Sequence, residues 1–377
     1  MEKTKVKTLV RQIRGVSYKP EDLHNELDDN SVVLLRANNI DEGKINFDDV
    51  VYVDKSKVSD EQYLKYGDIL ICASSGSKNL VGKAASIRFS KECTFGAFCK
   101  AIRPKEGLDE YLSVYFQSPI YRRKISEVAI GVNINNIRNE HIDELDIPVF
   151  SNDEQASIVK KIHLIQEVIS NRKAELEKLD DLIKARFVEM FGDAVDNPMG
   201  WEKRQLQEIV TDDCTISYGI VQTGDDQEEG VPVFRPVDIV NRVPKLDELK
   251  KTTEEISNKY KRTVLKGREM LITVRANIAD TYIIGEEFKG CNVGRGIVPI
   301  RTKEDIMVLE FLKYLMDSKH LNDKIKSKAK GITLIQLNME DLREVELIVP
   351  PLEQQKVFVE FANQVNKSKF GKLSTLL

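Results

Sequence analysis

Two kinds of hydrophobic pattern alternate along the chain and predict its secondary structure. Long segments at 109–128 and 306–328 predict helices, and Pro119 is expected to interrupt the first because proline breaks a helix interior. Short runs of β-branched and apolar residues, bounded by Gly, Asp and Asn, predict strands: VVLLR (32–36), VVYV (50–53), DILICA (68–73) and LDIPVF (145–150). Strands and helices in this order predict an α+β fold with a mostly antiparallel sheet.

Apolar residues spaced alternately by four and three mark a much longer helix that begins after Asn152 or Asp153, both suitable N-cap residues. They are Ile158, Ile162, Ile165, Ile169, Leu176, Leu179 and Ile183. Heptads sustained over this length indicate a coiled coil, and Gly192 is expected to end the helix. The segment from Glu353 to about Asn366 predicts a shorter helix as its partner. We therefore expect part of the long apolar stripe to stay uncovered and available to another protein.

An internal repeat with a period of 200 residues organises the whole chain. Residues 111–162 align with 311–362 without a gap, and 11 of these 52 positions are identical, against about 3 expected by chance. Upstream segments match with small shifts: 34–40 with 233–239, 67–71 with 267–272, and 93–103 with 291–301. Two copies of so long a unit indicate a tandem domain duplication, not a solenoid.

The amino-acid composition is typical of a folded protein with more than one domain. The 377 residues are 41% hydrophobic and 31% charged, which is typical of two or three folded domains. The N-terminus lacks a secretory signal and no apolar run is long enough to span a membrane, so we expect a cytoplasmic protein. Five cysteines without a C-x-x-C pair and four scattered histidines indicate reduced thiols, with no metal site and no charge relay. The net charge of −4 gives nucleic-acid binding no support, but basic runs recur at 72–105, 259–275 and 319–330.

Two short motifs raise the alternative of a self-sufficient enzyme. Asn-Pro-Met-Gly-Trp (197–201) resembles the Asn-Pro-Pro-aromatic motif of DNA adenine methyltransferases, with Met199 in place of the second proline. Glu-Phe-Lys (287–289) fits the Glu-x-Lys part of a metal-dependent nuclease site. No phosphate-binding loop or nucleophile elbow is present in the sequence. A DNA methyltransferase or nuclease is the second hypothesis, and a coiled-coil scaffold that does not bind nucleic acid is the third.

Several segments together resemble the DNA-specificity (S) subunit of type I restriction–modification enzymes over essentially the whole chain. These segments are RGVSYKPEDL (14–23), LLRANNID (34–41), GDILICASSGSKNLVGKAA (67–85), SYGIVQTG (217–224), GVPVFRPVDI (230–239) and LIVPPLEQQ (347–355). The resemblance implies a non-catalytic protein that recognises double-stranded DNA, each half reading one part of a bipartite, asymmetric site. It implies target-recognition domains at 1–151 and 193–351, a spacer helix at 152–192 and a shortened one at 352–377.

The resemblance also implies partners for this chain. The two helices would pack antiparallel and dock two methyltransferase subunits, which would bind S-adenosylmethionine, while restriction (motor–nuclease) subunits would bind ATP. No cofactor is expected in this chain itself, and the assembly is expected to be nucleoid-associated in a bacterial or archaeal cytoplasm.

Polar residues that follow the strand at 68–73, and polar residues around the corresponding segments of the second copy, are candidates for contacting DNA. In the first copy they are Ser74, Ser75, Gly76, Ser77, Lys78, Asn79 and Lys83, followed by Asn133, Asn135 and Arg138. In the second copy they are Arg268, Arg275, Asn277 and Gln336. Small donor-rich loops approach phosphates, and Arg and Asn make bidentate base contacts. The same residues also form ordinary hairpin turns, and that alternative stays open. Lysines and arginines at 122–124 and 324–328 are candidates for neutralising phosphates.

Overall fold

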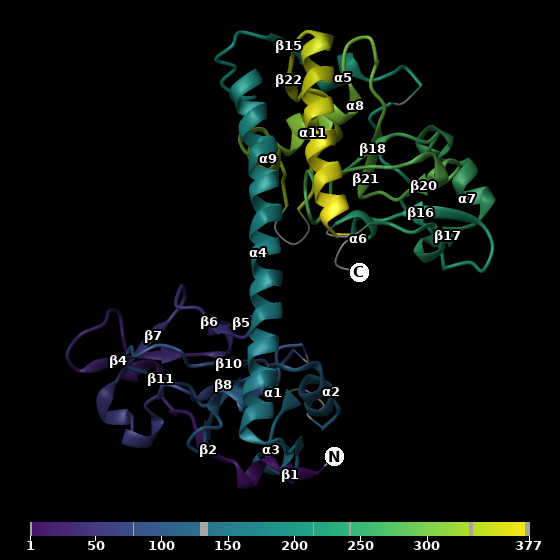
Figure 1. The fold of residues 1–377 in the computed structure, drawn as a ribbon. Helices are drawn as coiled ribbons and strands as arrows, with labels where there is room; N and C mark the ends of the chain where they lie inside the picture. Colours follow the sequence, from purple (N-terminus) through teal and green to yellow (C-terminus); the bar gives the residue numbers. More distant parts are fainter. Residues whose placement is uncertain are drawn as a thin grey trace. The chain divides into compact units, whose positions relative to one another are not determined.

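The computed structural model describes residues 2–77, 79–128, 135–213, 215–240, 243–331 and 335–373 (Figure 1), apart from the side chains of 135 and 370–373. The chain divides into two compact units, Met1–Asn171 (unit 1) and Arg172–Leu377 (unit 2). The domain limits named above stay a prediction. None of the helices within the described ranges is long and apolar enough to cross a lipid bilayer.

Unit 1 contains two four-stranded sheets. The first is antiparallel in the order β10-β8-β12-β2, with β2 (Val10–Arg14), β8 (Ile69–Cys72), β10 (Ala84–Ser86) and β12 (Cys99–Pro104). The second has the order β11-β4-β7-β3, with β3 (Leu23–His24), β4 (Ser31–Leu35), β7 (Val51–Asp54) and β11 (Cys93–Phe95), and only its β11–β4 pair is parallel. Smaller pairs are β1 (Lys3–Lys5) with β14 (Asp146–Pro148), β5 (Ile40–Asp41) with β6 (Lys44–Ile45), and β9 (Ser74–Ser75) with β13 (Asn135–Asn136). Its shorter helices are α1 (Asp109–Gln117), α2 (Pro119–Val128) and α3 (Asn139–Asp143).

Unit 2 repeats this plan with shorter sheets. Their orders are β19-β18-β21 and β17-β16-β20, formed by β16 (Val231–Phe234), β17 (Lys250–Thr252), β18 (Met270–Thr273), β19 (Thr281–Ile283), β20 (Asn292–Val293) and β21 (Ile297–Ile300). A further pair joins β15 (Glu202–Gln205) to β22 (Glu346–Val349). The helices are α5 (Leu206–Ile209), α6 (Pro236–Ile239), α7 (Glu254–Asn258), α8 (Leu309–Asp317), α9 (Lys319–Ser327) and α10 (Met339–Arg343).

The predicted duplication is confirmed in the chain path. β4, β8, β11 and β12 of unit 1 correspond to β16, β18, β20 and β21 of unit 2, with the same pairing directions. Gly15 and Gly219 mark one shared close approach, because a Cβ added there would lie 2.1 Å from the Gly96 carbonyl oxygen and 2.0 Å from that of Val293. A side chain larger than hydrogen therefore does not fit at this crossing in either unit.

A buried ion pair is also duplicated. In unit 1 the Asp68 carboxylate accepts hydrogen bonds from Arg103 Nε and Nη2 at 2.9 and 2.7 Å. In unit 2 the Glu269 carboxylate lies 2.5 Å from Arg301 Nη2. Both carboxylates are almost fully buried at the start of equivalent strands, β8 and β18. Such a pair tolerates burial because the charges are matched and hydrogen-bonded.

The long helix α4 runs from Asn152 to Phe191, as the heptad pattern predicts, and Gly192 follows it with φ +72°. The second helix, α11 (Leu352–Leu373), continues past Asn366, where the apolar pattern weakens. Within unit 2 the two helices pack antiparallel. The rings of Phe187 and Phe191 lie 5.4 and 5.7 Å from that of Phe358, and Lys369 near the end of α11 pairs with the earlier Asp180 of α4.

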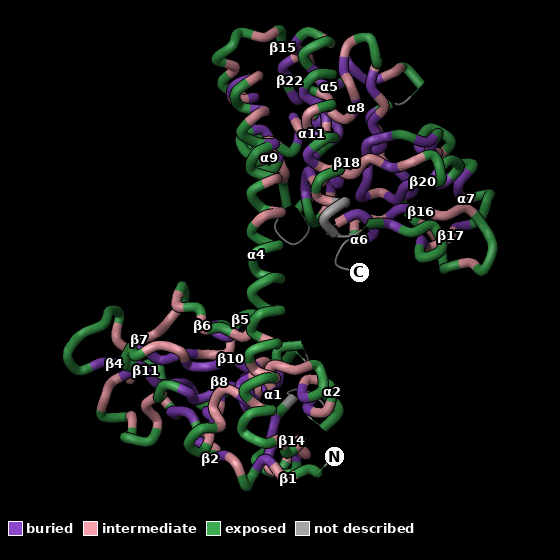
Figure 2. The backbone as a smooth tube through the Cα atoms, viewed as in Figure 1, coloured by how far each residue is buried: buried purple, intermediate pink, exposed green. Residues whose placement is uncertain are grey.

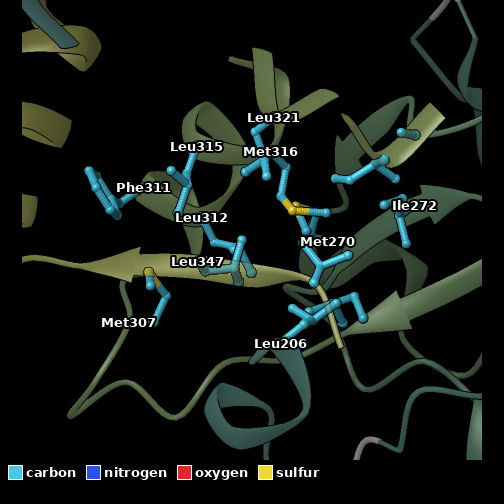
Figure 3. Packing of buried hydrophobic residues seen from close by; sticks show 14 of the residues in the cluster. Leu206, Met270, Ile272, Met307, Phe311, Leu312, Leu315, Met316, Leu321 and Leu347 are labelled. Carbon is cyan, nitrogen blue, oxygen red and sulfur yellow. The ribbon is translucent and has the colours of Figure 1, made fainter. Parts of the chain in front are cut away.

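The core of unit 2 joins this helix pair to the sheets. Side chains of α8, among them Phe311 and Leu312, pack with Met270 of β18 and Leu347 of β22 (Figure 3), and Phe187 and Phe191 belong to the same cluster. By contrast, the middle of α4 is solvent-exposed along its heptad stripe (Figure 2). Ile165 and Ile169 of the stripe are 54% and 49% exposed, and the adjacent Leu164 is 60% exposed. Part of the stripe is therefore uncovered, as expected from the shorter second helix.

Candidate nucleic-acid interface

The structure brings the two predicted polar loops of unit 1 together. β9 and β13 pair so that Ser74 lies opposite Asn136 and Ser75 opposite Asn135. The backbone NH of Ile137 also donates to the Ala73 carbonyl oxygen at 2.8 Å. Residues distant in sequence therefore form one polar edge beyond the end of β8. Lys78 and Asn133 lie outside the described residues, and only the backbone of Asn135 is described.

Internal hydrogen bonds hold the loop after β9 in place. The Ser77 NH donates to Ser75 Oγ at 3.1 Å, while Gly76 is exposed. Arg122 of α2 donates from Nη1 to the Val81 carbonyl oxygen at 2.6 Å and from Nη2 to that of Asn79 at 3.0 Å. Arg122, a candidate for neutralising phosphates, therefore stabilises this loop through hydrogen bonds to its backbone.

Lys83 and Arg138 are two further cationic candidates of unit 1. Lys83 is partly exposed, and its Nζ lies 4.0 Å from Asp41 Oδ1, at the limit of an ion pair. Arg138 is exposed immediately before α3. Exposed cations of this kind are available to phosphates, since a surface ion pair at such a distance is weak.

Unit 2 repeats the arrangement of the polar edge with different side chains. Arg275 and Gln336 form a bridge, and the Leu337 NH donates to the Val274 carbonyl oxygen at 2.9 Å. Ala276 and Ala279 have φ of +62° and +63°, a conformation that alanine rarely adopts and that the fold imposes on this loop. Within the described part of the chain the side chains of Arg275 and Asn277 make no hydrogen bond or ion pair, so their donors are available to a ligand.

Two predicted residues of unit 2 have other surroundings. The Gln336 side chain donates from Nε2 to Tyr218 Oη at 2.5 Å, so part of its amide is already used. Arg268 lies at the opposite end of β18 from Arg275, and its Nη2 is 2.9 Å from Glu310 Oε1. The structure therefore does not group Arg268 with the polar edge.

A groove beside this edge in unit 1 was not predicted. Its volume is about 580 Å³, and its lining includes Tyr18, Arg36, Asn38, Ser74 and Phe98. Phe98 is 70% exposed although its carbonyl oxygen accepts the backbone NH groups of both Ala73 and Ser74. The segments 34–40 and 93–103 belong to the repeat, but the sequence carries no signal that their side chains share a groove.

The two enzyme-like motifs serve the fold. Asn197 and Trp201 close a turn, with Asn197 Nδ2 donating to the Trp201 carbonyl oxygen at 2.8 Å and the Trp201 NH donating to Asn197 Oδ1 at 2.9 Å. In the Glu-Phe-Lys triplet, Phe288 is buried in a hydrophobic cluster. The described residues contain no group of three or more His, Cys, Asp or Glu side chains able to hold a metal ion.

The described cysteines are free and buried. They are Cys72, Cys93, Cys99 and Cys291. Burial raises the pKa of the Cys93 thiol to about 12 and that of Cys291 to about 11, so these thiols stay protonated at neutral pH. A protonated, buried thiol is a poor nucleophile, and these groups are part of the core.

Comparison with known proteins gives consistent matches across both units. The family model described as "Type I restriction modification DNA specificity domain" matches residues 18–179 and again residues 198–373. The StySPI specificity subunit of Salmonella potsdam is 29% identical over 386 residues, covering 96% of this chain and 81% of the relative. The EcoKI specificity subunit of Escherichia coli K12 is 37% identical over 203 residues, covering 54% of this chain and 44% of the relative.

Two solved structures share the fold. The S subunit of a type I restriction–modification system from M. genitalium superposes with a TM-score of 0.51 at 15% identity, covering 100% of this chain and 92% of that chain. A chain from a structure of the type I R-M system, described in terms of complex assembly and conformational transition, gives 0.54 at 20% identity, with 98% and 91% coverage. With two matches to one domain model and the same duplicated fold, this chain belongs to the type I restriction–modification DNA specificity family.

Proposed function

We propose that this chain is the DNA-specificity subunit of a type I restriction–modification system, in which each unit reads one part of a bipartite, asymmetric DNA sequence. One observation carries the proposal: two units with the same chain path present different side chains at the same edge. Ser74 and Asn136 occupy that edge in unit 1, and Arg275 and Gln336 occupy it in unit 2. A shared frame with different donors and acceptors suits two different half-sites, because base edges are distinguished by their hydrogen-bonding pattern.

The chemistry of the assembly then resides in partner chains. Methyltransferase subunits would bind S-adenosylmethionine, and restriction subunits would bind ATP, in the cytoplasm of a bacterium or archaeon. The exposed apolar residues of α4, Leu164, Ile165 and Ile169, support docking of a methyltransferase subunit on this helix, because a contiguous apolar stripe on a soluble protein marks an interaction surface.

The test is to purify the chain with its methyltransferase partner and to map the adenines that become methylated in a host carrying both. We expect one bipartite sequence with a fixed gap, and footprinting should show that insertion of one base pair in the gap abolishes protection. Methylation without a bipartite sequence, or protection that ignores the insertion, would overturn the proposal. Calorimetric titration of the lone chain with S-adenosylmethionine tests the alternative, because binding would favour a self-sufficient methyltransferase.

A further inference from the structure

A short turn has the same backbone frame in both units and lies beside the polar edge. We call residues 96–99 of unit 1 and 294–297 of unit 2 the tip turns. Each is closed by an i to i+3 hydrogen bond, from the Cys99 NH to the Gly96 carbonyl oxygen at 2.8 Å and from the Ile297 NH to that of Gly294 at 3.0 Å. The third residue of each turn accepts a backbone NH from the end of the central strand, at 2.8 Å from Ala73 and at 2.9 Å from Val274. The tip turns are therefore equivalent positions on one scaffold.

The side chains on these equivalent positions differ in chemistry. Unit 1 has Ala97 and Phe98, and Phe98 is the exposed aromatic residue of the groove. Unit 2 has Arg295 and Gly296 at the same positions, with Arg275 where unit 1 has Ser74.

The arginines of unit 2 differ in whether their charge is compensated. Arg235 is held by the buried Asp238, with Nε to Oδ2 at 3.1 Å and Nη2 to Oδ1 at 3.0 Å. Within the described residues, no ion pair or side-chain hydrogen bond involves Arg275 or Arg295. Unit 2 therefore presents two uncompensated guanidinium groups where unit 1 presents a hydroxyl and an aromatic ring.

Packing explains why the apolar side chain occurs in one unit only. A Cβ added to Gly296 would lie 2.6 Å from Pro236 Cγ and 3.2 Å from its Cδ, which is too close for any side chain. In unit 1 the position of Pro236 is occupied by Ala37, which lines the groove together with Phe98. Pro236 therefore excludes a side chain at position 296, whereas the smaller Ala37 lies in an open groove on whose lining Phe98 is exposed.

We propose, resting on the DNA-reading function above, that the tip turns, together with Arg275 beside the turn of unit 2, are specificity-determining positions and that they read different chemical features in the two half-sites. Phe98 makes apolar contact with the methyl group of a thymine in the half-site of unit 1. Arg275 and Arg295 donate hydrogen bonds to guanine in the half-site of unit 2. The thymine methyl is the apolar feature of the major groove, and guanine O6 and N7 are the acceptor pair that arginine matches.

The first test replaces each thymine of the unit 1 half-site in turn by uracil, which removes only the methyl group, and measures binding by the chain with its methyltransferase partner. We expect the wild type to lose about fourfold in affinity at one position, the value of one buried methyl group. Phe98→Ala should bind the thymine and uracil forms of that position equally. Tyr66→Ala is the matched control, because Tyr66 is a 65% exposed aromatic residue at the other end of β8 and should keep the uracil effect. A unit 1 half-site without thymine, or a Phe98→Ala variant that keeps the uracil effect, would overturn this part.

The second test concerns guanine. Arg275→Ala and Arg295→Ala should each reduce discrimination at a guanine of the unit 2 half-site by about 5- to 150-fold. Arg268→Ala is the matched control and should leave discrimination unchanged, because this residue lies at the other end of β18 and pairs with Glu310. Unchanged preference at every guanine in both the Arg275→Ala and the Arg295→Ala variants would overturn the assignment. In every variant the half-site of the other unit should still be read, which separates a local loss from misfolding. A wild-type complex that reads no bipartite sequence would instead refute the proposed function itself.

Discussion

Replacing Phe187 by alanine tests whether the end of α4 belongs to the core of unit 2. The Phe187 side chain is 5% exposed, and its ring lies 5.3, 5.8 and 5.4 Å from the rings of Phe191, Phe311 and Phe358. A buried Phe→Ala substitution costs about 3–5 kcal/mol through lost burial and the cavity left behind. Loss of three aromatic contacts places the expected value near the middle of that range, at about 4 kcal/mol. With a urea slope of about 2.5 kcal/mol per molar, the midpoint of unfolding should fall by about 1.6 M.

Fluorescence of Trp201 measures this change in the intact chain. It is the only tryptophan of the sequence, it lies in unit 2, and its indole NH donates to the Phe191 carbonyl oxygen at 3.1 Å. Val188→Ala is the matched control, because Val188 is the next residue and is 58% exposed, so its variant should stay within about 0.5 kcal/mol of wild type. A loss below about 1 kcal/mol for Phe187→Ala, or an equal loss for Val188→Ala, would refute the packing described for this helix pair.

Three further predictions concern buried charge, thiol ionisation and phosphate contacts. Arg103→Met leaves the Asp68 carboxylate buried without its cation and should lower the free energy of unfolding, measured by calorimetry, by about 3–5 kcal/mol. The double variant Arg103→Met/Asp68→Leu should restore most of this loss, and an Arg103→Met variant as stable as the wild type would contradict the prediction. Burial raises the pKa of the Cys93 thiol from 9.0 to about 12, so its contribution to stability is complete below pH 9 and is lost as the pH rises to 12. A disulfide reagent at pH 8 should therefore label Cys93 only when urea unfolds the chain, and equal labelling without urea would contradict this prediction. Lys83→Ala and Lys78→Ala should weaken DNA binding for all sequences and lower the salt slope by about 1, whereas a loss confined to one sequence would indicate base contact.

Much of the fold was predictable because the repeat and the heptads are strong periodic signals. The break in the helical segment of the second copy was not predicted. Pro119 was expected to break the helix of the first copy, and the segment 306–328 of the second copy, where Lys319 takes the place of this proline, was expected to be one helix. Both copies break at the equivalent serine, whose Oγ donates to the carbonyl oxygen three residues earlier at 2.7 Å in each, from Ser118 to Tyr115 and from Ser318 to Leu315. The local hydrogen bond, present in both copies, marks the shared break.

The candidate site was less accessible from sequence. The polar loops after β8 and β18 were predicted as candidates because donor-rich residues follow a strand, but their partners across the sheet edge depend on pairing over some sixty residues. Ala97 and Phe98 carry no polar pattern, so the tip turn gave no local signal. The bond from Gln336 to Tyr218 joins residues 118 positions apart, which no short motif reveals.

The continuity of α4 across the two units has a consequence for dissecting and recombining the gene. A fragment that starts in the Gly-Asp-Ala loop after Phe191 looks like a clean second module, yet it discards Ile183, Phe187 and Phe191, which belong to that module's hydrophobic cluster. Expression of the second module therefore needs a start near Arg172, inside the helix. By the same reasoning, a chimera that exchanges second modules between related chains keeps the core of that module intact when the junction lies in the helix near Arg172, whereas a junction in the loop combines Ile183, Phe187 and Phe191 of one chain with the core of another.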